Sequence, residues 1–141
     1  MASQGSAPAA PRSAEQRALA RVGVARRLRR ATLVVGLALL VVGYLRYGAR
    51  WVPAGMDTVP AVPPGTFCVI AKQAGSVQVG SHVFVELPDG REVFSRVATR
   101  SGDEITILHP NPHTGWPDSR TLGPLPLSAV RGLVLGAFKP R

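Results

Sequence analysis

The side chains in this sequence that are able to act as nucleophile or metal ligand are few and scattered. Cys68 is the one cysteine, so the chain cannot form an intrachain disulfide or a thiolate zinc site. The apolar residues around it predict a small core side chain rather than a nucleophile. His82, His109 and His113 lack the spacing of a metal site. The sequence therefore predicts neither a metal nor any other cofactor.

Lys72 is, with Lys139 near the C-terminal end, one of the two lysines in the sequence. It lies near two hydroxyls, Ser76 and Ser81, and a neutral lysine can take a proton from a serine that attacks a carbonyl. Alternatively, Lys72 is a solvated surface charge at the end of a strand, which is the more common role of such a lysine. Both interpretations stay open at this point.

A second polar group, Asp118-Ser119-Arg120, lies near the C-terminal end of the sequence. We expect Asp118 and Arg120 to form a buried or half-buried ion pair that fixes a loop. We expect Ser119 to hydrogen-bond to the backbone in the same loop.

Most of the net positive charge lies at the N-terminal end. The chain has 141 residues and a net charge of +9, and residues 1–30 contain seven arginines and one acidic residue, Glu15. Nucleic-acid binding would require basic side chains interleaved with aromatic ones on a folded surface. Here the arginines adjoin an apolar segment instead, so we do not expect a nucleic-acid partner. Residues 1–30 are predicted to form a basic, disordered tail.

The apolar segment, residues 31–45, contains fifteen residues without a charge. As a helix it would be about 22 Å long, whereas a bilayer core is about 30 Å thick. Snorkelling of Arg30 and Arg46 and an aromatic belt of Tyr44, Tyr47 and Trp51 compensate for the shortfall. We therefore predict a transmembrane anchor over residues 31–50.

The arginine imbalance across this anchor predicts a single-pass topology, with the N-terminus inside and the remaining chain on the trans side. A bacterial plasma membrane is favoured, with a mitochondrial inner membrane as the alternative. The bilayer is the first predicted partner.

Beyond Trp51 the sequence changes to short β-rich runs separated by proline and glycine. Turns are predicted at Pro88-Asp89-Gly90 and at residues 101–103. We thus predict a mainly β fold over residues 51–141, with one small domain of coiled antiparallel strands. The expected strands cover residues 66–72, 82–87, 92–99, 104–108 and 130–138.

The order of motifs after the anchor resembles the signal peptidase I family, the membrane-anchored Ser/Lys-dyad peptidases that trim exported precursors. The match extends from about Val52 to Pro140. Its strongest part is the segment PDSRTLGPLP at 117–126, followed by VRG at 130–132, which resembles the family's S-x-D-S-R-x-x-G-P-x-P segment and the strand after it. Upstream, the segment VPAGM at 52–56 resembles the catalytic P-S-x-S-M box, and SRV at 95–97 resembles its K-R-V. In this resemblance Met56, Arg96, Asp118, Ser119 and Arg120 are site-supporting residues.

Two departures from the family pattern fall on the catalytic positions. Gly55 stands at the position of the nucleophilic serine, and Ser95 stands at the position of the general-base lysine. Glycine has no side chain to attack a carbonyl, and the pKa of a serine hydroxyl is too high to make it a base near pH 7. Trp116 also replaces the serine expected two residues before Asp118.

The resemblance with these departures predicts a non-catalytic protein of signal peptidase I type. It would act as a peptide-binding module or as a partner of an active signal peptidase or a translocation component. The alternative is an active serine endopeptidase that removes signal peptides from exported precursors with a relocated dyad based on Lys72. The resemblance further implies an apolar strip of Trp51, Val52 and Met56 that rests on the lipid surface.

Overall fold

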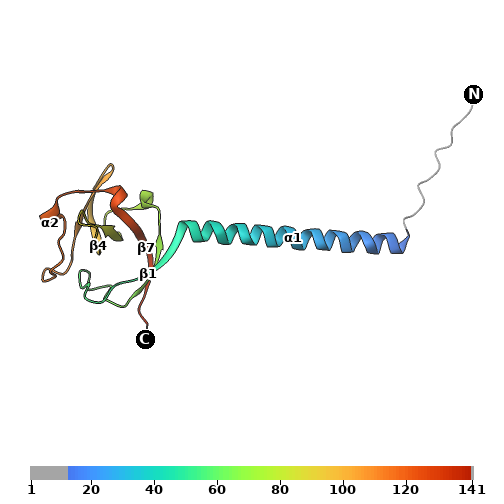
Figure 1. Ribbon diagram of the computed structural model, residues 1–141, viewed down its shortest axis with the longest axis horizontal. Helices are drawn as coiled ribbons and strands as arrows, with labels where there is room; N and C mark the ends of the chain where they lie inside the picture. Colours follow the sequence, from blue (N-terminus) through green and yellow to red (C-terminus); the bar gives the residue numbers. More distant parts are fainter. Residues whose placement is uncertain (1–12, 141) are drawn as a thin grey trace, which may run out of the picture. The chain divides into compact units, whose positions relative to one another are not determined.

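The computed structural model describes residues 13–140, which form one long helix followed by a curled antiparallel sheet (Figure 1). Contacts within the chain divide it into two units, residues 1–41 and 42–141. The sheet belongs to the second unit. A mainly β fold with coiled antiparallel strands after an N-terminal apolar helix is therefore confirmed.

Helix α1, Ala14–Arg46, begins well before the predicted anchor. The backbone N–H of Gln16 donates to Ser13 Oγ at 3.3 Å, which is a typical N-terminal cap. Residues 14–30 were expected in a disordered tail, and this expectation is wrong for them. They are rich in alanine, arginine and leucine, which favour helix, and they continue directly into the apolar run. Residues 1–12 of the predicted tail lie outside the described residues.

Helix α1 has 33 residues, and none of them is buried. By length and composition it can cross a membrane, and an N-terminal signal sequence would share these features. It ends at Arg46 rather than at residue 50. Its last carbonyl groups accept hydrogen bonds from Lys72, whose N–H bonds to Arg46 O at 2.9 Å and whose Nζ bonds to Tyr44 O at 2.8 Å. The chain then turns directly into a strand.

Seven strands form one sheet in the order β1-β2-β7-β3-β4-β5-β6, and every neighbouring pair is antiparallel. Five of them match the predicted strands closely. Two were not predicted: β1, which pairs with β2, and the two-residue β6. The bounds are β1 Tyr47–Trp51, β2 Phe67–Ala71, β3 His82–Glu86, β4 Glu92–Ser101, β5 Glu104–Leu108, β6 Leu125–Pro126 and β7 Val130–Phe138.

The predicted turn at residues 88–90 joins β3 to β4. Gly90 has a φ of +85°, and its N–H donates to Leu87 O at 2.9 Å. A side chain would strain this conformation, which explains the glycine. The short helix α2, Ser119–Leu122, lies between β5 and β6.

The core is made mainly of valine and isoleucine with two phenylalanines, Phe84 and Phe94, whose rings lie tilted against each other with centroids 5.0 Å apart. Cys68 is fully buried there, as predicted. The predicted apolar strip is wrong for two of its three residues, because Val52 is 1% exposed and Met56 3%. Backbone hydrogen bonds of Val52 with residues 65 and 66 hold that segment against the core, and only Trp51 remains exposed.

Candidate functional site

Gly55, which the resemblance aligns with a nucleophilic serine, lies at the surface in a tight turn. The N–H of Met56 donates to Pro53 O at 3.2 Å, and Gly55 has a φ of +83°. This φ fits the third residue of a type II turn, which requires a positive value. The indole Nε1 of Trp116 donates to Gly55 O at 3.3 Å and fixes the turn from the other side. Position 55 therefore presents backbone, held in a conformation that favours glycine.

Replacement of Gly55 by alanine should cost stability although the space around it is open. No atom lies within 4 Å of a Cβ built there, so the cost comes from the positive φ alone. We expect Gly55→Ala to lower the free energy of unfolding by about 1–2 kcal/mol. Gly115→Ala is the matched control, because Gly115 also has open space but no positive φ. Equal unfolding midpoints of the two variants would contradict this expectation.

Ser95, which the resemblance aligns with a general-base lysine, is fully buried on β4. Its Oγ lies 2.8 Å from Nδ1 of His109, a residue just beyond the end of β5. The register of the two strands, which places Arg96 opposite Leu108, brings the preceding and following residues together. The hydroxyl at position 95 is thus used in an internal hydrogen bond and has no access to solvent.

The second ring nitrogen of His109 fixes the direction of this hydrogen bond. Nε2 lies 3.0 Å from Pro117 O, and a carbonyl oxygen can only accept, so Nε2 carries the proton. Nδ1 of the neutral ring then accepts from the Ser95 hydroxyl. A serine that donates to a histidine can be an activated nucleophile, but this requires that a substrate carbonyl reach the hydroxyl. Burial of Ser95 prevents that approach, and the pair links β4, β5 and the loop before α2.

Asp118 is the charged centre of that loop. Its carboxylate is 4% exposed, caps α2 by accepting from Arg120 N at 3.0 Å, and accepts from His109 N at 3.2 Å. The guanidinium of Arg120 pairs with it at 2.7 Å. The predicted ion pair is confirmed. Ser119 also bonds to backbone, but to strand β5 rather than within its own loop, because its Oγ accepts from Ile107 N at 2.9 Å.

The pKa values of His109 and Asp118 shift in the same direction. Burial lowers the pKa of His109, and the Pro117 carbonyl and the Asp118 carboxylate offset this only in part. Burial alone would raise the pKa of Asp118, but hydrogen bonds from Arg120 and from the His109 N–H outweigh it, and the pKa is lowered. Each group therefore gives up its proton more readily in the folded protein than in the unfolded one.

Stability should consequently fall with acid in two stages. In each case the unfolded chain binds more protons below the group's ordinary pKa, so protonation favours unfolding. The first loss of stability is expected as the pH drops below about 6.5. This is the ordinary pKa of His109 and of His82, and burial lowers the pKa of both. The second follows below 3.8, the ordinary pKa of Asp118. Thermal melting as a function of pH measures both, and His109→Gln should reduce the first stage. An unchanged melting temperature between pH 7.5 and pH 5 would contradict it.

The side chains of Met56 and Thr58 form hydrogen bonds with the backbone of β4 at the residue before Ser95. Phe94 N donates to Met56 Sδ at 3.0 Å, and the Thr58 hydroxyl donates to Phe94 O. An extended peptide that added to this part of β4 as a strand would need both of those backbone groups. The chain's own side chains therefore occupy the backbone groups that such a peptide would use.

Lys72 lies at the end of β2, where its ammonium bonds to Tyr44 O and lies 4.8 Å from the centre of the Tyr44 ring. Within residues 13–140 this is its one side-chain hydrogen bond, and neither Ser76 nor Ser81 is its partner. Arg96 is exposed and lies on the opposite side of β4 from Ser95. The structure thus brings Gly55, Met56, Ser95 and Asp118 into one connected region, and it places Lys72 and Arg96 outside that set of hydrogen bonds.

Sequence reasoning missed the roles of His109 and Trp116, which connect the parts of this region. One signal was available for His109, because Ile105, Ile107 and His109 alternate as inward-facing residues do in a strand. Comparison of the chain with known protein families and with curated proteins found no match.

Proposed function

We propose that this chain is a non-catalytic, single-pass membrane protein of signal peptidase I type that acts by binding. The observation that carries the proposal is the pair of positions at which such a peptidase needs its dyad. Gly55 has no side chain, and Ser95 is buried against His109. Neither residue offers a nucleophile or a base to a peptide bond.

The connectivity of the site supports the link to that family. Three segments that carry the resemblance, residues 52–56, 95–97 and 117–126, are far apart in the sequence. Met56 bonds to Phe94, which directly precedes the second segment, and His109 bonds to both Ser95 in the second and Asp118 in the third. A chance similarity of short motifs would not require them to meet.

The site favours a protein partner over a peptide held across the dyad positions. Met56 and Thr58 already bond to the backbone of Phe94, and Trp116 lies against Gly55. An active signal peptidase or a translocation component therefore fits the surface better than an extended precursor does. Helix α1 would supply the anchor, with the arginine-rich end inside and the β domain on the trans side, in a bacterial plasma membrane.

The test is the fate of an exported precursor incubated with the full chain in liposomes. We expect the precursor to remain intact when its mass is followed over time, and an active signal peptidase serves as the positive control. Cleavage would overturn the proposal. If cleavage occurs, the variant Lys72→Met tests whether Lys72 is the general base. A dyad based on Lys72 would lose its turnover in Lys72→Met and keep it in the control variant Lys139→Met.

A further inference from the structure

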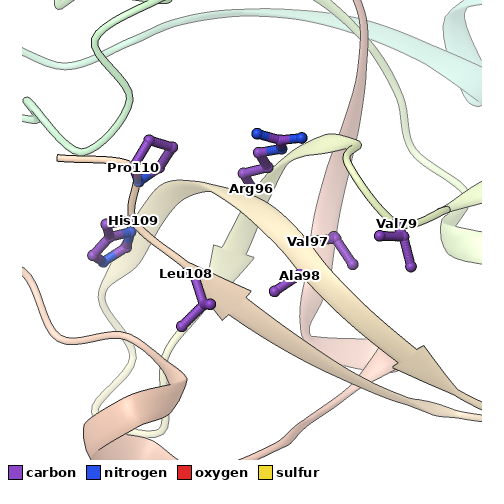
Figure 2. Close-up of a pocket in the computed structure, with 7 residues that line it drawn as sticks. All are labelled: Val79, Arg96, Val97, Ala98, Leu108, His109 and Pro110. Carbon is purple, nitrogen blue, oxygen red and sulfur yellow. The ribbon is translucent and has the colours of Figure 1, made fainter.

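A pocket of about 240 Å³ lies on β4, β5 and the residues that directly follow β5 (Figure 2). We propose that it binds the free C-terminal residue of a peptide, with the apolar side chain in the pocket and the α-carboxylate on Arg96. The pocket is lined by Val79, Arg96, Val97, Ala98, Leu108, His109 and Pro110. It shares only His109 with the region around Ser95.

Most residues that line the pocket are apolar, and two of its large aliphatic side chains are accessible. Val79 is 65% exposed and Leu108 39%, although both are large aliphatic residues. The strand pairing between β4 and β5 shifts register between Val97 and Thr99, so Ala98 lies at a bulge. A bulge with a small residue leaves a depression in an otherwise continuous surface. Figure 2 shows the valines and Ala98 on one side of this depression and Leu108 to Pro110 on the other.

Arg96 is the one charged side chain in the lining. Its guanidinium lies beside Gly80, where a Cβ would be 3.6 Å from Nη2. In the part of the chain that the structure describes, the side chain of Arg96 makes no hydrogen bond or ion pair. Four other arginines of the domain each pair with a carboxylate: Arg50, Arg91, Arg120 and Arg131. An unpaired guanidinium beside an apolar depression favours a ligand with an anionic and an apolar part.

His109 does not compete for that charge. Both of its ring nitrogens are already bonded, to Ser95 and to Pro117, so it contributes the edge of a neutral ring to the pocket. The pocket therefore has a single cationic group. A carboxylate matches it better than a phosphate dianion, because one guanidinium balances the single charge of a carboxylate and would leave half the charge of a dianion uncompensated.

The size of the pocket indicates a peptide end rather than a lipid acid. Sites for drug-sized ligands usually enclose about 300–1,000 Å³, and this pocket is smaller. One apolar side chain fits such a volume, whereas a long acyl chain would extend beyond it. Hydrolysis of a peptide bond after an apolar residue is the class of reaction that supplies this ligand. That placement beside a peptidase rests on the proposed function, but the binding site itself does not.

The test uses the full chain in phosphatidylcholine nanodiscs and a fluorescent pentapeptide that ends in leucine. We expect the free acid to bind at least about tenfold more tightly than its C-terminal amide, measured by fluorescence anisotropy. Arg96→Gln should reduce the affinity for the acid to that for the amide. Val79→Asp should weaken binding of the acid more than that of the amide, because it removes an apolar contact from both and adds a negative charge that repels only the acid. Arg131→Gln, on β7, is the matched control for loss of one positive charge.

Equal affinity for acid and amide would overturn the inference, and so would the absence of binding up to millimolar peptide. Equal losses of affinity for the acid in Arg96→Gln and Arg131→Gln would show unspecific charge attraction and would also overturn the inference. Competition by dodecanoate as strong as that by unlabelled peptide would assign the pocket to lipid acids and overturn the peptide assignment. The proposed function fails separately, by precursor cleavage, which none of these measurements involves.

Discussion

Ser95→Lys should lower the free energy of unfolding by about 3–5 kcal/mol, the usual cost of an unpaired buried charge. Ser95 is fully buried, and its hydroxyl donates to a neutral histidine. A lysine there would place an ammonium group in the core without a carboxylate to receive it and would also need more volume. Melting of the full chain in detergent, followed by tryptophan fluorescence, measures the loss.

Thr99→Lys is the matched control for this prediction, because residue 99 lies on the same strand and is exposed. It should change the melting temperature little. If Ser95→Lys were as stable as this control, position 95 would have to open toward solvent, and the account of the site would be wrong.

The stability cost of a buried lysine also affects any variant that places a Ser/Lys dyad at positions 55 and 95. The double variant Gly55→Ser, Ser95→Lys combines a buried lysine with a side chain at a φ of +83°. We expect the pair to destabilise the domain rather than to create a peptidase. Precursor cleavage by the double variant would show that the two positions still form a working cleft.

Asp118→Ala should be the most damaging change in the loop before α2, with a loss of about 2–4 kcal/mol. It removes the cap of α2 and leaves the N–H of His109 buried without an acceptor. Asp118→Asn keeps one acceptor oxygen and should recover part of the loss. The same unfolding assay measures both variants.

Asp89→Ala is the control for the loss of a carboxylate that pairs with an arginine. Asp89 pairs with Arg91 at the surface, and exposed pairs contribute little. A loss of stability in Asp89→Ala as large as that in Asp118→Ala would contradict the role given to burial and capping.

Most of the sheet could be predicted from local patterns, but strand β1 and the start of helix α1 could not. Five strands were predicted because their apolar and polar residues alternate between clear turn signals. Strand β1 has the sequence YGARW and shows no such pattern; it is a strand because β2 offers it a partner. The start of α1 depended on the helix propensity of an arginine-rich segment, which a reading based on charge underestimates.

The site divides in the same way into local and distant contacts. Asp118 and Arg120 are two residues apart, so their ion pair could be predicted from the sequence alone. The bond between Ser95 and His109 depends on the register of β4 and β5, and the bond between Trp116 and Gly55 joins residues 61 positions apart. Neither contact leaves a signal within one short window of sequence.

The most direct test of the central claim is a search for an activated serine in the full chain. The protein is incubated with a serine-directed acylating reagent, beside an active signal peptidase, and its intact mass is measured. Because position 55 carries no hydroxyl and Ser95 is buried, we predict that the mass stays unchanged while the peptidase gains one acyl group. A single adduct on this chain, mapped to Ser76, Ser81 or Ser95, would contradict the claim.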